Sequence, residues 1–206
     1  MKTYQVNEIF CSLQGEGVRA GTLNHFVRFS GCNLQCSVEH GPLSPGGFDC
    51  DTEFASGRKM SAEEVLIELQ TLNPNCKNII FTGGEPGLQL TAELADFFHG
   101  SGYYLAIETN GSIDLHANGV TLDWITCSPK VAEHAVRLKT ASEVKYVRGY
   151  GQGIPRPTCQ AKYKLVSPAF NGIEMDRRAM DWCIKLINEN PEWRLSVQLH
   201  KFVMVR

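Results

Sequence analysis

The chain has 206 residues, which is enough for one domain with a sizeable core and too few for several large ones. Hydrophobic residues make up 43% and charged residues 20% of the sequence, and this composition excludes a disordered chain. The formal net charge is −2, so the overall charge gives no reason to bind nucleic acid or an anionic membrane. We therefore expect a soluble domain with neither of these partners.

The start of the chain, MKTYQVNEIF, lacks the apolar core of a signal peptide. No run approaches the roughly 18 apolar residues that a membrane helix needs. Eight cysteines are too few for a disulfide scaffold, and a reducing compartment would keep them as thiols. The sequence predicts a cytoplasmic protein in which clustered thiols are metal or redox ligands.

Strand patterns alternate with helix patterns along the chain. Short strands are predicted at residues 5–10, 24–30, 78–82, 103–108, 121–126, 142–147 and 163–166, and closing strands at 194–199 and 202–205. Helices are predicted behind the capping box SAEE at 61–64, around the apolar residues at 94, 97 and 98, and at 176–189. This alternation predicts an α/β fold with a mostly parallel sheet and with functional residues at the carboxyl ends of the strands.

A long polar loop at residues 33–59 interrupts this pattern, and loops of that length are usually functional. Cys32, Cys36 and Cys50 lie at its start and within it, with the spacing Cys-x3-Cys-x13-Cys. Thiolates bind zinc and iron–sulfur clusters. Structural zinc sites and cubane clusters normally take four protein ligands, so three cysteines around a four-iron cluster would leave one iron open. Such a centre could bind a substrate or cofactor.

Two alternatives to a cluster stay open at this point. The three cysteines and His40 could hold zinc, or the thiols could carry no metal. We expect the other cysteines to be ordinary core or scattered thiols: Cys11, Cys76, Cys127, Cys159 and Cys183.

The strand at 78–82 ends in a glycine turn, TGGEP at residues 82–86. Paired glycines let a ligand approach the backbone, and the exposed carbonyls there could accept hydrogen bonds from an ammonium group. On its own, however, such a turn is also an ordinary way to end a strand.

Together, the three-cysteine loop and the glycine turn resemble the radical S-adenosylmethionine (SAM) superfamily, whose members bind SAM through its amine and carboxylate on the open iron. Further motifs follow in the order typical of one family: LQGEG at 13–17, FVRFSGCNL at 26–34, CDT at 50–52, FTGGEP at 81–86, IETNG at 107–111, CSPK at 127–130 and WRLSVQLHK at 193–201. Over nearly its whole length the chain thus resembles the 7-carboxy-7-deazaguanine synthases.

This resemblance implies an incomplete parallel (β/α) barrel of the radical-SAM type, formed by a single domain over residues 1–206. It implies a lyase of queuosine and 7-deazapurine biosynthesis that converts 6-carboxy-5,6,7,8-tetrahydropterin to 7-carboxy-7-deazaguanine with loss of ammonia. In that family a 5′-deoxyadenosyl radical, formed from SAM at a reduced [4Fe-4S] cluster, abstracts hydrogen from the pterin, and ring contraction follows. The resemblance also implies Mg²⁺, an electron donor such as flavodoxin, and a homodimer.

The resemblance also assigns roles to individual positions. Cys32, Cys36 and Cys50 would hold the cluster, and Thr52 would bind Mg²⁺. The residues implied to contact SAM are Asp49, Cys50, Asp51, Gly84, Ser128, Pro129, Lys130, Ser167, Pro168, Ala169 and Phe170. The residues implied to contact the pterin are Leu13, Gln14, Gly15, Arg28, Thr82 and Arg206.

The sequence departs from the family in two places. Many members have Cys-x3-Cys-x2-Cys, and some lengthen the loop so that the middle cysteine lies near the third, where this chain has Gly46 and Gly47. We expect residues 38–48 to bulge outward and Cys50 to return to the cluster. The second departure is VSPAF at 166–170, where relatives often have Gln-Pro.

Simpler interpretations remain for several of these positions. Arg28 could form a surface ion pair, Gln14 could be a loop residue, Lys130 could be solvated, and Thr52 could belong to a turn. Two other functions also remain open: a glycyl-radical activase, which shares the radical-SAM core but acts on a protein, and a zinc-stabilised binding module.

Overall fold

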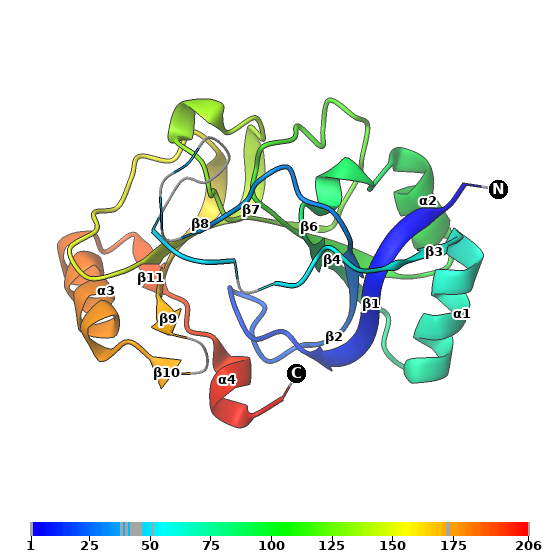
Figure 1. Cartoon of the computed structure of the whole chain (residues 1–206), viewed down its shortest axis with the longest axis horizontal. Helices are drawn as coiled ribbons and strands as arrows, with labels where there is room; N and C mark the ends of the chain where they lie inside the picture. Colours follow the sequence, from blue (N-terminus) through cyan, green and yellow to red (C-terminus); the bar gives the residue numbers. More distant parts are fainter. Residues whose placement is uncertain are drawn as a thin grey trace.

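A nine-stranded mixed sheet forms the centre of the computed structural model, which describes residues 2–37, 39, 41, 47–50, 52–171 and 174–205 (Figure 1). The strand order is β11-β8-β7-β6-β5-β4-β2-β1-β3. The strands are β1 (Tyr4–Leu13), β2 (Leu23–Phe29), β3 (Arg58–Met60), β4 (Asn78–Gly83), β5 (Tyr104–Thr109), β6 (Trp124–Cys127), β7 (Thr140–Arg148), β8 (Gln160–Pro168) and β11 (Trp193–Leu195). A separate hairpin pairs β9 (Phe170–Asn171) with β10 (Glu174–Met175).

Every pair from β2 to β11 across the sheet is parallel, whereas β1 pairs antiparallel with both β2 and β3. Three helices lie outside the curved sheet, with α1 (Ala62–Leu72) against β1, α2 (Ala92–Gly100) against β5 and α3 (Arg177–Glu189) against β8 and β11 (Figure 1). The predicted α/β architecture with a mostly parallel, open barrel is confirmed. None of the described helices is long and apolar enough to cross a membrane.

Side-chain caps stabilise the starts of three helices, and the sequence predicts the one at residues 61–64. At α1 the Ser61 hydroxyl accepts a hydrogen bond from the Glu64 amide at 3.2 Å, and the Glu64 carboxylate accepts one from the Ser61 amide at 2.7 Å. Thr91 accepts from an amide of the first turn of α2, and Asp176 does the same at α3. These caps satisfy amides that have no partner within the helix, so each helix begins where its cap lies.

Because side chains alternate along a strand, the sheet has two distinct faces. One face carries Ile79, Phe81, Leu105 and Ile107 into the main core, where they meet the helices. The opposite face, here called the inner face, carries a smaller apolar cluster that includes Phe10, Phe26, Ile80, Ala106 and Trp124.

Polar side chains cross this inner face at one level. In the strand registers Glu8 lies opposite Arg28, Arg28 opposite Thr82, Glu108 opposite Thr126, and Thr126 opposite Glu143. A row of charged and hydroxyl groups on an otherwise covered sheet is unusual for a core, so this face is where a polar ligand would bind.

The last part of the chain differs from the sequence prediction. Residues 202–205, predicted as a strand, are not extended: α4 (Leu199–Val203) ends at Met204, whose φ of 55° is left-handed. The strand predicted at 194–199 is shorter and is confined to β11. Three further short strands, β3, β9 and β10, are not predicted by the sequence. The Leu199 amide donates to the Gly15 carbonyl at 2.8 Å, so here the chain leaves the sheet to contact the first loop.

Candidate active site

The three cysteines of the long loop lie near one another. Cys32 follows the carboxyl end of β2, and the Cys50 amide donates to the Cys36 carbonyl at 3.2 Å. Burial raises the pKa of the Cys32 thiol, and the nearby Glu85, Cys36 and Cys50 raise it further. Cys32 and Cys36 are partly buried, whereas Cys50 is exposed, and all three are free thiols. Three thiols that lie near one another, one of them exposed, could hold a metal group that has three protein ligands.

The glycine turn at Gly83 and Gly84 packs against the backbone at the start of this loop. Gly83 has a φ of +110°, and a Cβ there would overlap the Phe29 backbone, so the turn requires glycine. A Cβ at Gly84 would overlap the Gly31 carbonyl and come within 3.1 Å of the Cys32 Cβ. The paired glycines therefore let the cluster loop pack directly on the turn.

Glu85 ties the same turn to the end of β5. Its buried carboxylate accepts hydrogen bonds from the Thr109 hydroxyl at 2.7 Å, the Asn110 amide at 2.7 Å and the Gly87 amide at 2.9 Å. Burial raises the pKa of this carboxyl group, although these three donors oppose the shift. The Asn110 side chain in turn donates to the Asn33 side chain at 3.2 Å, so the motifs around Cys32, Glu85 and Asn110 form one connected structure.

Two groups of the positions that the resemblance assigns to SAM lie at the carboxyl ends of β6 and β8. Ser128, Pro129 and Lys130 follow β6, and the Lys130 ammonium donates to the Ser128 hydroxyl at 3.2 Å. The Lys130 charge also lowers the pKa of Cys36, against a larger increase from burial and a further one from Cys50, so the lysine lies near the cluster loop. Asp51 lies outside the described residues, and so does the alternative zinc ligand His40.

The second group of predicted SAM contacts, Ser167 to Phe170, lies at the end of β8. Ser167 is buried on the inner face, opposite Val147 in the register. Pro168 ends the strand, and the Ala169 amide donates to the Arg148 carbonyl at 3.0 Å. The structure thus brings strand ends β2, β4, β6 and β8 to one edge of the sheet.

Predicted substrate residues lie on or beside the inner face. Arg28 donates to the Glu8 carboxylate at 2.8 Å, next to Thr82 on the neighbouring strand. Gln14 is buried, and its amide nitrogen donates to Glu108 at 2.7 Å. Leu13 ends β1, and Gly15 lies against α4. Arg206 is outside the described residues.

Sequence reasoning missed a second set of polar residues in this region. Glu16 forms a buried ion pair with Lys145 on β7 and also accepts from the Gln198 side chain at 2.7 Å. The Gly17 amide donates to the Ser196 hydroxyl at 2.9 Å. Burial opposes both charges of the ion pair, yet pairing prevails: the pKa of Glu16 falls to about 2 and that of Lys145 rises.

Glu143 binds the same loop, residues 14–18, at Val18, the residue after Gly17. Its carboxylate accepts from the Val18 amide at 2.8 Å and from the Thr126 hydroxyl at 2.7 Å. The detectable signal is the alternation of SEVKYV at 142–147, which places Glu143 and Lys145 on one face of the strand and Val144 and Tyr146 on the other.

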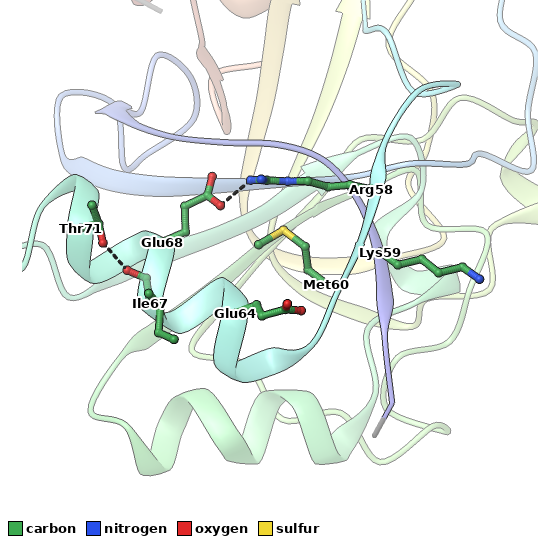
Figure 2. Close-up of a pocket in the computed structure, with 7 residues that line it drawn as sticks. All are labelled: Arg58, Lys59, Met60, Glu64, Ile67, Glu68 and Thr71. Atoms are coloured by element: carbon green, nitrogen blue, oxygen red, sulfur yellow. Dashed lines mark hydrogen bonds and ion pairs between the residues drawn. The ribbon is translucent and has the colours of Figure 1, made fainter.

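A surface hollow between β3 and α1 is separate from all these residues (Figure 2). Figure 2 shows Arg58 of β3 paired with Glu68 of α1 across it, and the Thr71 hydroxyl donates to the Ile67 carbonyl at 2.8 Å. The residues that line this hollow include none of those that the resemblance assigns to the iron–sulfur cluster, SAM or the pterin.

Comparisons with known proteins agree with this geometry. A family model described as a 4Fe-4S single cluster domain matches residues 13–105. The 7-carboxy-7-deazaguanine synthases of Bacteroides thetaiotaomicron and Burkholderia multivorans are each 36% identical to the chain; the matches cover 98% of this chain in both cases, and 98% and 99% of the relatives. The crystal structure of QueE from Escherichia coli shares the fold, with a TM-score of 0.68 and 23% identity over 96% of this chain and 95% of that one. Such similarity over the full length shows that the chain belongs to the 7-carboxy-7-deazaguanine synthase family.

Proposed function

We propose that the protein converts 6-carboxy-5,6,7,8-tetrahydropterin to 7-carboxy-7-deazaguanine with loss of ammonia, as a radical-SAM lyase of queuosine and 7-deazapurine biosynthesis. The observation that carries this proposal is the 36% identity to 7-carboxy-7-deazaguanine synthases over 98% of the chain. The thiol loop beside a polar inner face supports it, because it provides a cluster site and a ligand site at the same edge of the sheet.

Cys32, Cys36 and Cys50 hold the [4Fe-4S] cluster in this proposal, and the fourth iron stays open for SAM. Held there, the reduced cluster would supply one electron to cleave SAM to methionine and a radical able to abstract hydrogen. The role of the protein is to position the reactants and exclude water. Residues 1–206 form one domain in this proposal, with an enlarged cluster-binding loop at about residues 33–59.

The SAM contacts are assigned to the strand ends around the thiols. Asp49 and Asp51 flank Cys50, and Gly84 lies behind Cys32, where its backbone faces the methionyl end. The ribose and adenine side contacts the loops after β6 and β8: Ser128, Pro129, Lys130, Ser167, Pro168, Ala169 and Phe170. The assignment of Lys130 to this site is supported by its proximity to Cys36, because a cation there also stabilises the negative charge of a thiolate.

The pterin lies on the inner face in this proposal. Arg28 binds its carboxylate, with the second side of the guanidinium left for the substrate while Nη1 holds Glu8. Gln14 and Thr82 supply fixed donors and acceptors for the flat ring, together with the backbone of Leu13 and Gly15. Thr52 provides one oxygen to Mg²⁺, which prefers oxygen ligands, and Arg206 closes over the substrate.

Partners and location complete the proposal. The reduction requires an electron donor such as flavodoxin, and the protein acts as a homodimer. All eight cysteines are free thiols, which fits a reducing compartment such as the cytoplasm.

The test is an anaerobic assay of the reconstituted enzyme with carboxytetrahydropterin, SAM, Mg²⁺ and a chemical reductant. We expect 7-carboxy-7-deazaguanine to form and ammonia to be released in equal amounts. A parallel assay supplies a glycyl-radical enzyme as the substrate and looks for its glycyl radical by electron paramagnetic resonance. If only that second assay gives product, the protein is an activase and the proposal is wrong.

A further inference from the structure

Two cysteines and a histidine outside the active site lie together between the sheet and the α1–β4 connection. Cys11 lies on β1 directly opposite His25 on β2, and Cys76 lies two residues before β4. The two sulfur atoms and a ring nitrogen of His25 are all within 4.8 Å of one another. Among the described residues no other three cysteine, histidine or acidic side chains come this close.

The group formed by Cys11, His25 and Cys76 lies far from the thiol loop around Cys32, Cys36 and Cys50. Cys76 precedes β4 and the glycine turn follows it, so the six residues of β4 separate the two places. At about 3.3 Å per residue the strand alone spans about 20 Å. Cys11 and His25 are also on the helix-covered face of the sheet, as the register with Ile79 shows, whereas the proposed substrate residue Arg28 is on the inner face.

The hydrogen bonds of His25 leave a ring nitrogen for another partner. The side chain is fully buried, and Nε2 lies 3.1 Å from the Asn73 carbonyl. A carbonyl only accepts, so Nε2 carries the proton and Nδ1 carries the lone pair. Nδ1 has no hydrogen-bond partner among the described residues, and a buried polar atom in that state is costly. Metal-binding histidines commonly have a second ring nitrogen held by a carbonyl in this way.

The two thiols lie close enough to interact with each other, and burial together with the neighbouring Cys76 thiol raises the pKa of Cys11. The Cys76 sulfur also makes long contacts of 3.6 Å to the carbonyls of Leu23 and Asn78. Cys11 is partly buried, so the cluster is open to solvent on that side. Nearby, the buried Tyr103 hydroxyl has no partner in the described part of the chain, and its ring centroid is 6.4 Å from that of His25.

We propose that Cys11, His25 and Cys76 form a second metal site that binds one Zn²⁺, with water in the fourth position. Two thiolates and an imidazole are ligands that zinc prefers over magnesium or calcium. In a tetrahedral zinc site, bonds of about 2.3 Å to sulfur and 2.0–2.1 Å to nitrogen place the ligand atoms about 3.5–4 Å apart. The observed limit of 4.8 Å is wider, so zinc binding would draw the three side chains closer together.

The role of this zinc is structural. Asn73 caps the end of α1, and its carbonyl accepts from both His25 and the Cys76 amide. A zinc ion there joins the α1–β4 connection to the β1–β2 hairpin at the antiparallel edge of the barrel. It does not take part in the reaction proposed above, so it can be tested separately from the activity.

The test uses full-length protein, purified and reconstituted anaerobically, then washed with a mild chelator and analysed for zinc and iron by mass spectrometry. We expect about one tightly held zinc per chain, with a zinc-edge X-ray absorption spectrum that fits two sulfurs at about 2.3 Å and two nitrogen or oxygen atoms at about 2.0–2.1 Å. Cys76→Ser and Cys11→Ser should each lower bound zinc at least about tenfold while iron is retained. Cys159→Ser is the matched control, because it changes another buried cysteine and should keep the zinc.

A second readout does not depend on metal counting. Adding zinc to stripped protein should raise the melting temperature of the wild type and of Cys159→Ser, but not that of Cys76→Ser. Substoichiometric zinc in the wild type, equal zinc in Cys76→Ser, or a spectrum with three sulfurs, which indicates zinc in the cluster loop, would each overturn the proposal. A Cys11–Cys76 disulfide in protein kept anaerobic, detected by peptide mass spectrometry, would do the same.

Discussion

Arg28 and Glu8 face each other across the antiparallel β1–β2 pair, with the guanidinium Nη1 2.8 Å from the carboxylate. The Arg28 guanidinium also lies over the Phe10 ring, 5.2 Å from its centroid. Two neighbours therefore orient the arginine, which leaves its planar group directed along the inner face.

We expect Arg28→Lys to raise the KM for the pterin about tenfold or more and to leave SAM binding unchanged. Lysine keeps the charge, but it cannot keep Glu8 and also bind a carboxylate with two parallel bonds, a loss of about 1.5–3 kcal/mol. Steady-state kinetics and equilibrium SAM binding measure the two effects. The control is Arg58→Lys, in the ion pair of the hollow in Figure 2, which should change neither. A normal pterin KM in Arg28→Lys removes this residue from the substrate site.

The cluster ligands give the second prediction. Cys32→Ala, Cys36→Ala and Cys50→Ala should each lose most of the about four irons per chain and all turnover, because three thiolates are the minimum set. Cys76→Ala and Cys159→Ala should keep both. Iron and sulfide analysis after anaerobic reconstitution gives the answer. If Cys36→Ala keeps its cluster and activity, the middle ligand must be sought elsewhere in the chain.

Much of the fold could be predicted because its signals are local. The capping box at Ser61 and Glu64 and the alternation of short apolar strands with helices are readable without tertiary contacts. The end of the chain could not be predicted, because the FVMV pattern suits a strand, whereas the structure has α4 there, with the Leu199 amide bonded to the distant Gly15 carbonyl.

The candidate site shows the same division. Cys32, Gly84 and Arg28 lie in recognisable motifs, so their neighbourhood was predictable. The pairing of Glu16 with Lys145 joins positions more than a hundred residues apart, and no local pattern indicates which acid meets which base. The grouping of Cys11, His25 and Cys76 could not be predicted for the same reason: the three lie far apart in the sequence, and no local pattern brings them together.

The buried Glu16–Lys145 pair gives the third prediction. Lys145→Met should lower the free energy of unfolding in urea by about 3–5 kcal/mol, because it leaves a buried carboxylate without its cation. The double variant Glu16→Gln/Lys145→Met should recover a large part of that loss, since no buried charge remains. If the single and double variants are equally destabilised, the lysine stabilises the protein through packing and not through the charge.

The same pair predicts how acid acts on the fold. The pKa of Glu16 is about 2 in the folded protein against an ordinary value of 4.5. A lowered folded-state pKa stabilises the protein above pH 4.5, and this contribution is lost as the pH falls from about 4.5 to about 2. Urea unfolding of the cluster-free protein across this range should show a steeper loss in the wild type than in the double variant.

Gly15 and His200 give the fourth prediction. A Cβ on Gly15 would overlap the His200 imidazole, so Gly15→Ala should displace α4 from the loop that carries Gln14. We expect the pterin KM to rise several-fold while cluster content stays normal. Gly15→Ala/His200→Ala removes the overlapping ring and should restore a KM close to that of His200→Ala alone. If the second substitution gives no rescue, the glycine is needed for a reason other than this contact.

The last prediction concerns Thr52 and Mg²⁺. Thr52 lies two residues after Cys50, and the Cys50 thiol contacts its carbonyl at 3.5 Å, so the threonine belongs to the same loop as the thiols. A Mg²⁺ ion that takes the hydroxyl, substrate oxygens and waters would orient the pterin toward the radical, and orientation matters greatly when one particular hydrogen must be abstracted. We expect Thr52→Ala to keep its iron and to cleave SAM slowly without forming product, whereas Thr52→Ser should keep most turnover because it retains the oxygen. Chelator-treated wild type should regain activity when Mg²⁺ is added back, and Thr52→Ala should not. Full turnover by Thr52→Ala, together with no Mg²⁺ response in the wild type, would remove the ion from this site.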